Sequence, residues 1–228
     1  MSVVMNGKRV VITREMEQAQ QFAEVIRQVG GEPLIYPCIA YAPLTVEIPT
    51  PQNYDWLIFT SRNTVRAMQG IDYSGVKIAA IGKKTAAVLS HPVDFIPSSP
   101  NAASLATELP ICPGERVLIP CSALAAQTLA NGLTMRGAVV NQLAIYTMTI
   151  GTGGDDVPRM LDQNQVDILT FTSPSTVRNF LKRVNDHPNA YHLPAVCIGD
   201  TTAQAAIMNG FKHVYSARGS MIEVLCLI

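Results

Sequence analysis

The sequence predicts an α/β protein made of two similar, doubly wound parallel-sheet domains. Short apolar runs alternate with amphipathic helical patterns along the chain, as expected when parallel strands are joined by helices. The chain also repeats itself: residues 55–66, DWLIFTSRNTVR, align with residues 167–178, DILTFTSPSTVR. Because solenoid repeats are only about 20–50 residues long, a repeat at this much greater spacing indicates duplicated domains.

The first predicted unit shows how the elements are assigned. Residues 9–13, RVVIT, form an apolar β-rich run that predicts a buried strand. Apolar residues then recur on one face of a helix up to Val29, and Gly30-Gly31 supplies the left-handed cap that ends it. The same strand–turn–helix pattern is predicted five more times, at 55–68, 78–89 and 116–135, after Asp167 and after Ala195.

The boundaries between the domains are predicted to fall inside each repeat. Residues 37–51 carry four prolines and residues 143–158 carry three glycines, which indicates extended or flexible connections. The chain would then cross twice between flavodoxin-like domains, giving a two-segment hinge beside a cleft. The expected parts are a terminal domain of residues 1–38 plus 150–228, a central domain of residues 42–144, and linkers at 39–41 and 145–149.

Composition narrows the class of protein. The 228 residues include 17 Lys and Arg against 17 Asp and Glu, and 48% are apolar. Disorder is excluded by this apolar content, and a nucleic-acid partner is not expected without a basic excess. We expect no membrane partner, since no apolar run approaches the roughly 20 residues of a spanning helix. Five scattered cysteines without a Cys-x-x-Cys pair and the lack of a secretory signal favour the cytoplasm.

Hydroxyl-bearing and basic residues follow nearly every predicted strand. In open α/β sheets ligands bind at the carboxyl ends of the strands, beside helix N-termini that favour anions. Each Ser or Thr alone is more simply explained as a helix cap. Several of them converging on one cleft suggest a ligand with many negative charges. The candidate binding residues are Arg14, Ser61, Arg62, Lys83, Thr85, Ser122, Ser173 and Thr202.

Common catalytic motifs are missing. The run Gly82-Lys83-Lys84-Thr85 resembles the end of a phosphate-binding loop, but Lys77 stands where that loop needs glycine. No histidine has a metal-ligand partner at the usual spacing, and no Gly-x-Ser-x-Gly elbow occurs. We therefore expect no metal site. Tyr146 ends an apolar strand at the predicted crossing, where it either packs in the hinge or presents its hydroxyl to the cleft.

Several segments taken together resemble the uroporphyrinogen-III synthase family. They run from residue 9 to about residue 215 and keep the family's order and spacing. Two positions differ from the usual pattern: Glu15 stands where proline is common, and residues 120–125 lack the arginine of the family's turn. The segments that carry the resemblance are Arg9–Arg14, Asp55–Ser61, Ala80–Thr85, Arg136–Val140 leading to Tyr146, Phe171–Pro174 and Ile198–Ala203.

The resemblance implies a cofactor-independent lyase of tetrapyrrole biosynthesis. Its substrate would be hydroxymethylbilane, closed to uroporphyrinogen III with loss of water and inversion of ring D. The eight carboxylates of this substrate agree with the anion-favouring loops. The resemblance further implies that Tyr146 is the residue nearest to a catalytic role and that the chain works as a monomer.

Two other classes remain open from the residues. A two-domain ligand-binding or sensor protein without catalysis would share the hinge and the cleft. A nucleotide-sugar transferase would need a glycine loop for pyrophosphate, and the chain does not show one.

Overall fold

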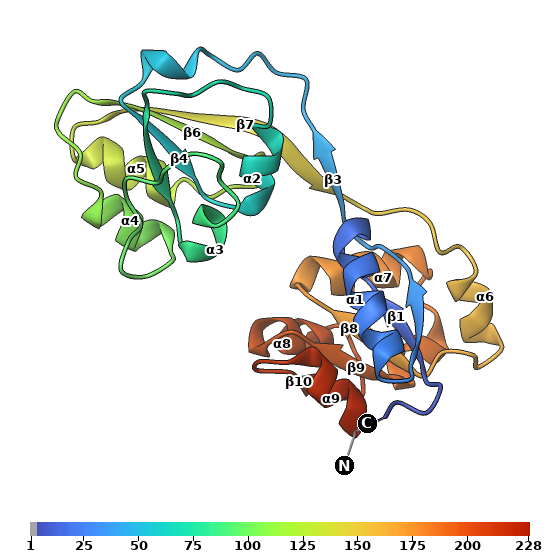
Figure 1. The fold of residues 1–228 in the computed structure, drawn as a ribbon. Helices are drawn as coiled ribbons and strands as arrows, with labels where there is room; N and C mark the ends of the chain where they lie inside the picture. Colours follow the sequence, from blue (N-terminus) through green and yellow to red (C-terminus); the bar gives the residue numbers. More distant parts are fainter. Residues whose placement is uncertain (1–3) are drawn as a thin grey trace. The chain divides into compact units, whose positions relative to one another are not determined.

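The computed structural model describes residues 4–228, which divide into two compact units (Figure 1). Unit 1 combines the N-terminal segment up to Ala40 with Thr149–Ile228, and unit 2 is Tyr41–Met148. None of the helices in residues 4–228 has both the length and the apolar character needed to cross a membrane.

Unit 1 contains a five-stranded parallel sheet in the order β2-β1-β8-β9-β10. Numbered along the chain within the unit, this order is 2-1-3-4-5, the flavodoxin-like arrangement. The direction of winding reverses between β1 and β8, which places the expected ligand-binding edge at their carboxyl ends. The strands are β1 (Arg9–Ile12), β2 (Glu32–Ile35), β8 (Ile168–Phe171), β9 (Pro194–Cys197) and β10 (His213–Ser216).

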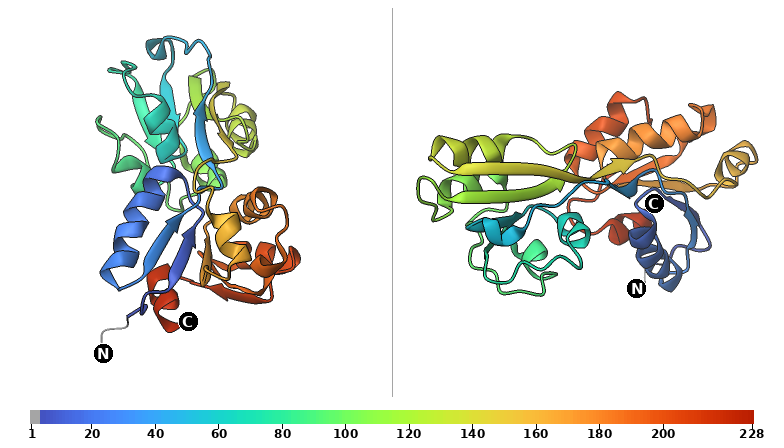
Figure 2. Two further views of the ribbon diagram at one scale, coloured as in Figure 1. Left: turned by 90° about the vertical axis from the view of Figure 1, so that its right-hand side faces the viewer. Right: turned by 90° about the horizontal axis from the view of Figure 1, so that it is seen from above.

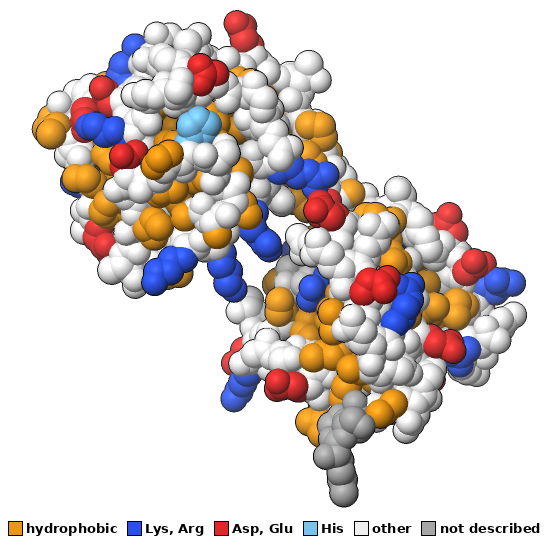
Figure 3. Space-filling model, in the orientation of Figure 1, with side chains coloured by type: hydrophobic (Ala, Val, Ile, Leu, Met, Phe, Trp, Pro, Cys, Tyr) orange, Lys and Arg blue, Asp and Glu red, His pale blue; other side chains and the backbone are white. Residues whose placement is uncertain are grey.

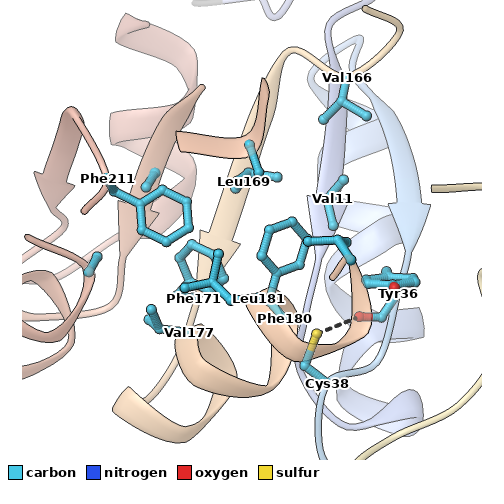
Figure 4. Packing of buried hydrophobic residues seen from close by; sticks show 14 of the residues in the cluster. Val11, Tyr36, Cys38, Val166, Leu169, Phe171, Val177, Phe180, Leu181 and Phe211 are labelled. Carbon is cyan, nitrogen blue, oxygen red and sulfur yellow. Dashed lines mark hydrogen bonds between the residues drawn. The ribbon is translucent and has the colours of Figure 1, made fainter. Parts of the chain in front are cut away.

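Helices cover both faces of this sheet because side chains alternate along each buried strand. Val10 and Ile12 pack with α1 (Met16–Gln28) and α9 (Met221–Leu227). Val11 points to the other face, where it joins the aromatic cluster that Figure 4 shows around Phe171 and Phe180. The elements on that face are α6 (Val157–Asp162), α7 (Pro174–Arg183), the 3₁₀ turn η2 (Pro188–His192) and α8 (Asp200–Met208).

Unit 2 has the sheet order β5-β4-β6-β7-β3, in which the four strands β5-β4-β6-β7 correspond to β2-β1-β8-β9 of unit 1. Four strands are parallel, and the winding reverses between β4 and β6. The fifth strand, β3, runs antiparallel to β7, since Leu44 N–H donates to the Ile145 carbonyl while the Thr149 hydroxyl donates to the Ala40 carbonyl. The strands are β3 (Ala40–Pro43), β4 (Trp56–Phe59), β5 (Lys77–Ala80), β6 (Arg116–Ser122) and β7 (Val139–Thr149).

The helices of unit 2 also lie on two faces (Figure 2). One core cluster packs the sheet against α4 (Ala102–Glu108) and α5 (Thr128–Met135). The other cluster lies beside α2 (Arg62–Ala67) and α3 (Lys83–Ala86), and the short turn η1 (Pro51–Asn53) precedes β4. The duplication read from the sequence therefore covers four parallel strands of each sheet, whereas the edge strands β10 and β3 differ in chain position and direction.

The expected linkers at 39–41 and 145–149 are largely strand. Ala40 begins β3, and β7 continues without a break through residues 145–149. The physical reason is that the two segments pair with each other, so each satisfies the other's backbone hydrogen bonds. The proline and glycine content predicted extended or flexible connections here, and these residues are largely paired as strand.

Candidate functional site

The predicted residues of unit 2 lie along one edge of its sheet, at the carboxyl ends of the parallel strands. Ser61 follows β4 and is the N-cap of α2, where its Oγ accepts the N–H of Thr64 at 3.0 Å. Ser122 ends β6 and is the register partner of Tyr146 on β7. Ser61 and Ser122 therefore flank the reversal point of the sheet, where ligands of such folds bind.

Tyr146 is tied directly to this edge. Its hydroxyl lies 3.0 Å from Oγ of Ser61, and the residue is 5% exposed. Its ring stacks on Tyr41 of β3, with ring centroids 5.2 Å apart and planes inclined by 27°. Tyr146 therefore packs in the core of unit 2, and its hydroxyl contacts the N-cap residue of α2 at the carboxyl edge.

The hydrogen bonds of Ser61 limit how the hydroxyl protons of Ser61 and Tyr146 are shared. Its Oγ already accepts from the N–H of Thr64, and it lies 3.0 Å from both the Thr64 hydroxyl and the Tyr146 hydroxyl. A serine hydroxyl has one proton to donate. When that proton goes to Tyr146, the phenol keeps its own proton free for a ligand.

Basic side chains lie beside this edge. Figure 3 shows Lys and Arg side chains gathered over α2 and α3. Arg62 and Lys83, both predicted to bind substrate, are exposed at the first positions of these helices. Neither helix carries an acidic residue in its first turn. The first turns of α2 and α3 therefore present the positive charge of Arg62 and Lys83 to solvent.

Arg14 occupies the corresponding edge of unit 1, directly after β1. Its guanidinium lies over the Phe22 ring at 4.5 Å and within 3.3 Å of the Met221 sulfur. Within residues 4–228 it has no carboxylate partner, and its Nε is buried without a hydrogen-bond acceptor. Burial lowers the pKa of Arg14. A half-buried cation without an acid is suited to receive a carboxylate from a ligand.

Ser173 lies at the neighbouring strand end. It is the N-cap of α7 and forms a capping box with Thr176, while its Oγ lies 2.8 Å from Oγ of Ser175. Because β8 pairs with β1, Ser173 and Arg14 follow adjacent strands at the reversal point of unit 1. The ten-residue helix α7 directs its free N–H groups toward this edge.

Thr85 and Thr202 are placed differently from the other candidates. Both side chains are buried, at 6% and 3% exposure, in the first turns of α3 and α8. They hold the same position after the N-cap as Thr64 and Thr176 do in α2 and α7. This burial argues against direct contact with a ligand, and the N-caps of the two helices are Gly82 and Gly199.

Sequence reasoning missed two partners in this site, Tyr41 and Thr64. Tyr41 lies in a proline-rich segment and reaches Tyr146 only through the pairing of β3 with β7. Thr64 could have been found, since Ser-x-x-Thr is repeated at Ser61 and Ser173 and resembles a capping box. In the part of the chain that the structure describes, no three His, Cys, Asp or Glu side chains are grouped to hold a metal.

Comparison with known families gives a match over most of the chain. Residues 20–225 match the family described as uroporphyrinogen-III synthase HemD. The uroporphyrinogen-III synthase of Synechococcus elongatus is 31% identical over 76% of this chain and 74% of its own length. The chloroplastic uroporphyrinogen-III synthase of Oryza sativa is 30% identical over 90% of this chain and 74% of its own length. The porphyrin biosynthesis protein HemD of Ruminiclostridium josui is 29% identical over 96% of this chain, which spans 48% of that longer protein.

Solved structures share the fold. Uroporphyrinogen-III synthetase from Helicobacter pylori superposes with a TM-score of 0.64 at 19% identity, covering 97% of this chain and 96% of that one. A mutant uroporphyrinogen III synthase from Thermus thermophilus gives a TM-score of 0.58 at 21% identity, covering 97% of this chain and 99% of that one. At these identities the likeness establishes the two-domain α/β architecture.

Proposed function

Because the chain belongs to the uroporphyrinogen-III synthase family, we propose that it closes hydroxymethylbilane to uroporphyrinogen III with loss of water and inversion of ring D. The observation that carries the residue assignment is the hydrogen bond between Tyr146 and Ser61 at the reversal point of unit 2. In this proposal the protein is a carbon–oxygen lyase that needs no metal and no organic cofactor. It acts as a monomer.

The proposed proton path uses groups already at this edge. Ser61 donates to the phenol oxygen of Tyr146, and the phenol gives its proton to the hydroxyl on ring A as the carbon–oxygen bond breaks. Water leaves, and the substituted ring D carbon attacks the azafulvene that remains, giving a spirocyclic pyrrolenine. The bond from that carbon to its original methylene bridge then breaks, and ring D closes onto the freed methylene through its other α-carbon, which inverts the ring. The proton returns when the ring D carbon that forms the final bond loses its hydrogen. Substrate is thereby converted to product and water, with atoms balanced.

Substrate binding is assigned to the carboxyl edges of both sheets. Carboxylates are received by the guanidinium of Arg14, which has no carboxylate partner in residues 4–228, by the free N–H groups of α7 beside Ser173, and by the exposed Arg62 and Lys83. Ser122 adds a hydroxyl beside Tyr146. These charges act locally, so a chain of zero net charge can hold a substrate with eight carboxylates. Most of the rate enhancement comes from orientation of ring D and stabilisation of transient charge.

The decisive experiment is an isomer assay. Purified protein is mixed with freshly generated hydroxymethylbilane in the presence of EDTA, and the oxidised products are separated by liquid chromatography. We expect the type III isomer, at a rate proportional to enzyme concentration. Only the type I isomer, as in the reaction without protein, would overturn the proposal. Stoichiometric binding without turnover would favour the sensor alternative.

A further inference from the structure

Arg183, at the end of α7, contacts both chain segments that join unit 1 to unit 2. Its Nη1 donates to the carbonyl of Pro37 at 2.5 Å, and its Nη2 donates to the carbonyl of Gly153 at 2.7 Å. Its guanidinium also lies over the Tyr36 ring at 3.8 Å. Pro37 lies on the segment that leads into β3, and Gly153 lies on the segment that follows β7. One side chain therefore bridges the outgoing and the returning link.

The two links are in direct backbone contact at this point. A methyl group added at Gly151 would overlap the Pro37 carbonyl, and one added at Gly154 would overlap the Ile35 carbonyl. Helix α7 makes a further bond, from the Asn179 amide to the Cys38 carbonyl at 2.8 Å. The links are thus held against each other and against one helix.

Arg183 holds the two links through the hydrogen-bond geometry of its guanidinium more than through its charge. Asp155 lies 3.6 Å from Nη2 but is 92% exposed, so this ion pair contributes little. The Arg183 side chain is only 12% exposed, and two of its nitrogens each serve a different link. A lysine ammonium, as a point charge on a flexible stem, cannot reproduce this arrangement.

The other end of α7 reaches the candidate site, because Ser173 is its N-cap. We infer that Arg183 fixes the direction in which both links leave unit 1 and, through α7, couples that direction to the ligand-binding edge. Arg183 is thereby a positioning residue for the cyclisation. The structural part stands without the proposed function, and only the kinetic part rests on it.

The structural part is tested by measuring the distance between the units in the full chain. Spin labels are placed through Met135→Cys and Met208→Cys, which are exposed positions in unit 2 and unit 1, after Cys112→Ser and Cys226→Ala. We expect Arg183→Met to broaden the distance distribution obtained by pulsed electron paramagnetic resonance. Arg178→Met, at an exposed arginine of the same helix, should leave it unchanged.

The kinetic part uses the same variants. We expect Arg183→Met to lower kcat and raise KM together, as hinge substitutions often do, by up to about 100-fold in kcat/KM. Arg183→Lys should give an intermediate broadening and an intermediate loss, and it serves if the methionine variant does not fold. A lower melting temperature with unchanged distances and kinetics would overturn the inference, since Arg183 would then be merely structural. Broadened distances in a chain that shows no cyclisation would uphold the clamp and reject the proposed function.

Discussion

The hydroxyl of Tyr146 lies 3.0 Å from Oγ of Ser61, and this contact joins the long strand β7 to the N-cap of α2. The two residues are 85 positions apart in the chain. Their meeting follows from the sheet order, since β4 and β7 both flank β6 and all three strands end at the same edge. The capping serine therefore holds the phenol at the edge where we expect the ligand to bind.

Replacing Tyr146 with phenylalanine removes the proposed proton donor while keeping the buried ring. We expect kcat to fall by roughly 10–100-fold with KM and melting temperature nearly unchanged, a modest effect compared with the largest contributions of one positioned acid. Tyr73→Phe is a matched control, because Tyr73 is buried in the same core cluster. Equal turnover in the two variants would assign Tyr146 to packing.

Ser61 and Tyr146 should act as one unit. Ser61→Ala removes an N-cap, which costs about 0.5–2 kcal/mol of stability, and also removes the partner of the phenol. In a double-mutant cycle with Tyr146→Phe, we expect the effects on kcat to be clearly less than additive. Ser173→Ala removes the equivalent cap in unit 1 and should combine additively with Tyr146→Phe. Additivity in both cycles would mean that the Ser61 contact plays no part in turnover.

Arg14 should contribute to substrate binding rather than to stability. Arg14→Met removes a half-buried cation that has no acid partner in the described chain, so the free energy of unfolding should stay constant or rise. KM for hydroxymethylbilane should increase about tenfold or more, since a hydrogen bond to a charged group is worth about 1.5–3 kcal/mol. Arg9→Met is the control, because Arg9 lies at the amino end of the same strand and pairs with Asp167. Its KM should not change.

How far the sequence could anticipate this site depends on the range of each contact. Ser61 and Ser173 were predictable because a residue after a parallel strand must lie at the carboxyl edge, whatever its neighbours are. The contact of the Tyr41 ring with Tyr146 and the bond from Arg183 to Pro37 were not, because both join segments more than 100 residues apart. No local propensity encodes such a partner. The prolines around residues 37–51 also indicated an extended link, although part of it pairs as β3.

Two buried thiols should make the protein sensitive to alkali. Burial raises the pKa of Cys38 and of Cys197 from 9.0 to about 12. Between pH 9 and 12 the unfolded chain loses these protons while the folded chain keeps them, so the free energy of unfolding falls as pH rises. The slope is at most about 1.4 kcal/mol per pH unit for each thiol.

The test is a series of urea unfolding curves from pH 8 to 11. Cys38→Ala should flatten the decline, since it removes one of the protons that the unfolded chain loses and the folded chain keeps. Val177→Ala removes packing in the same cluster without removing a titratable group. It should lower the free energy of unfolding at every pH and leave its slope against pH unchanged. A Cys38→Ala slope equal to that of the unaltered protein would contradict the prediction.

Gly154 has both a left-handed backbone and closely packed neighbours. Comparison with Gly7 separates the cost of the two. The φ of Gly154 is +74°, and an added methyl group would overlap the Ile35 carbonyl and the Tyr36 side chain. Gly7 has the same φ of +74° but open space around it. Gly7→Ala should therefore cost about 1–2 kcal/mol of stability, from the left-handed backbone alone. Gly154→Ala should cost a further 1–3 kcal/mol or so, because a packed backbone must move. Urea unfolding of the two variants measures the difference, and equal losses would show that the links can separate at Gly154 without cost.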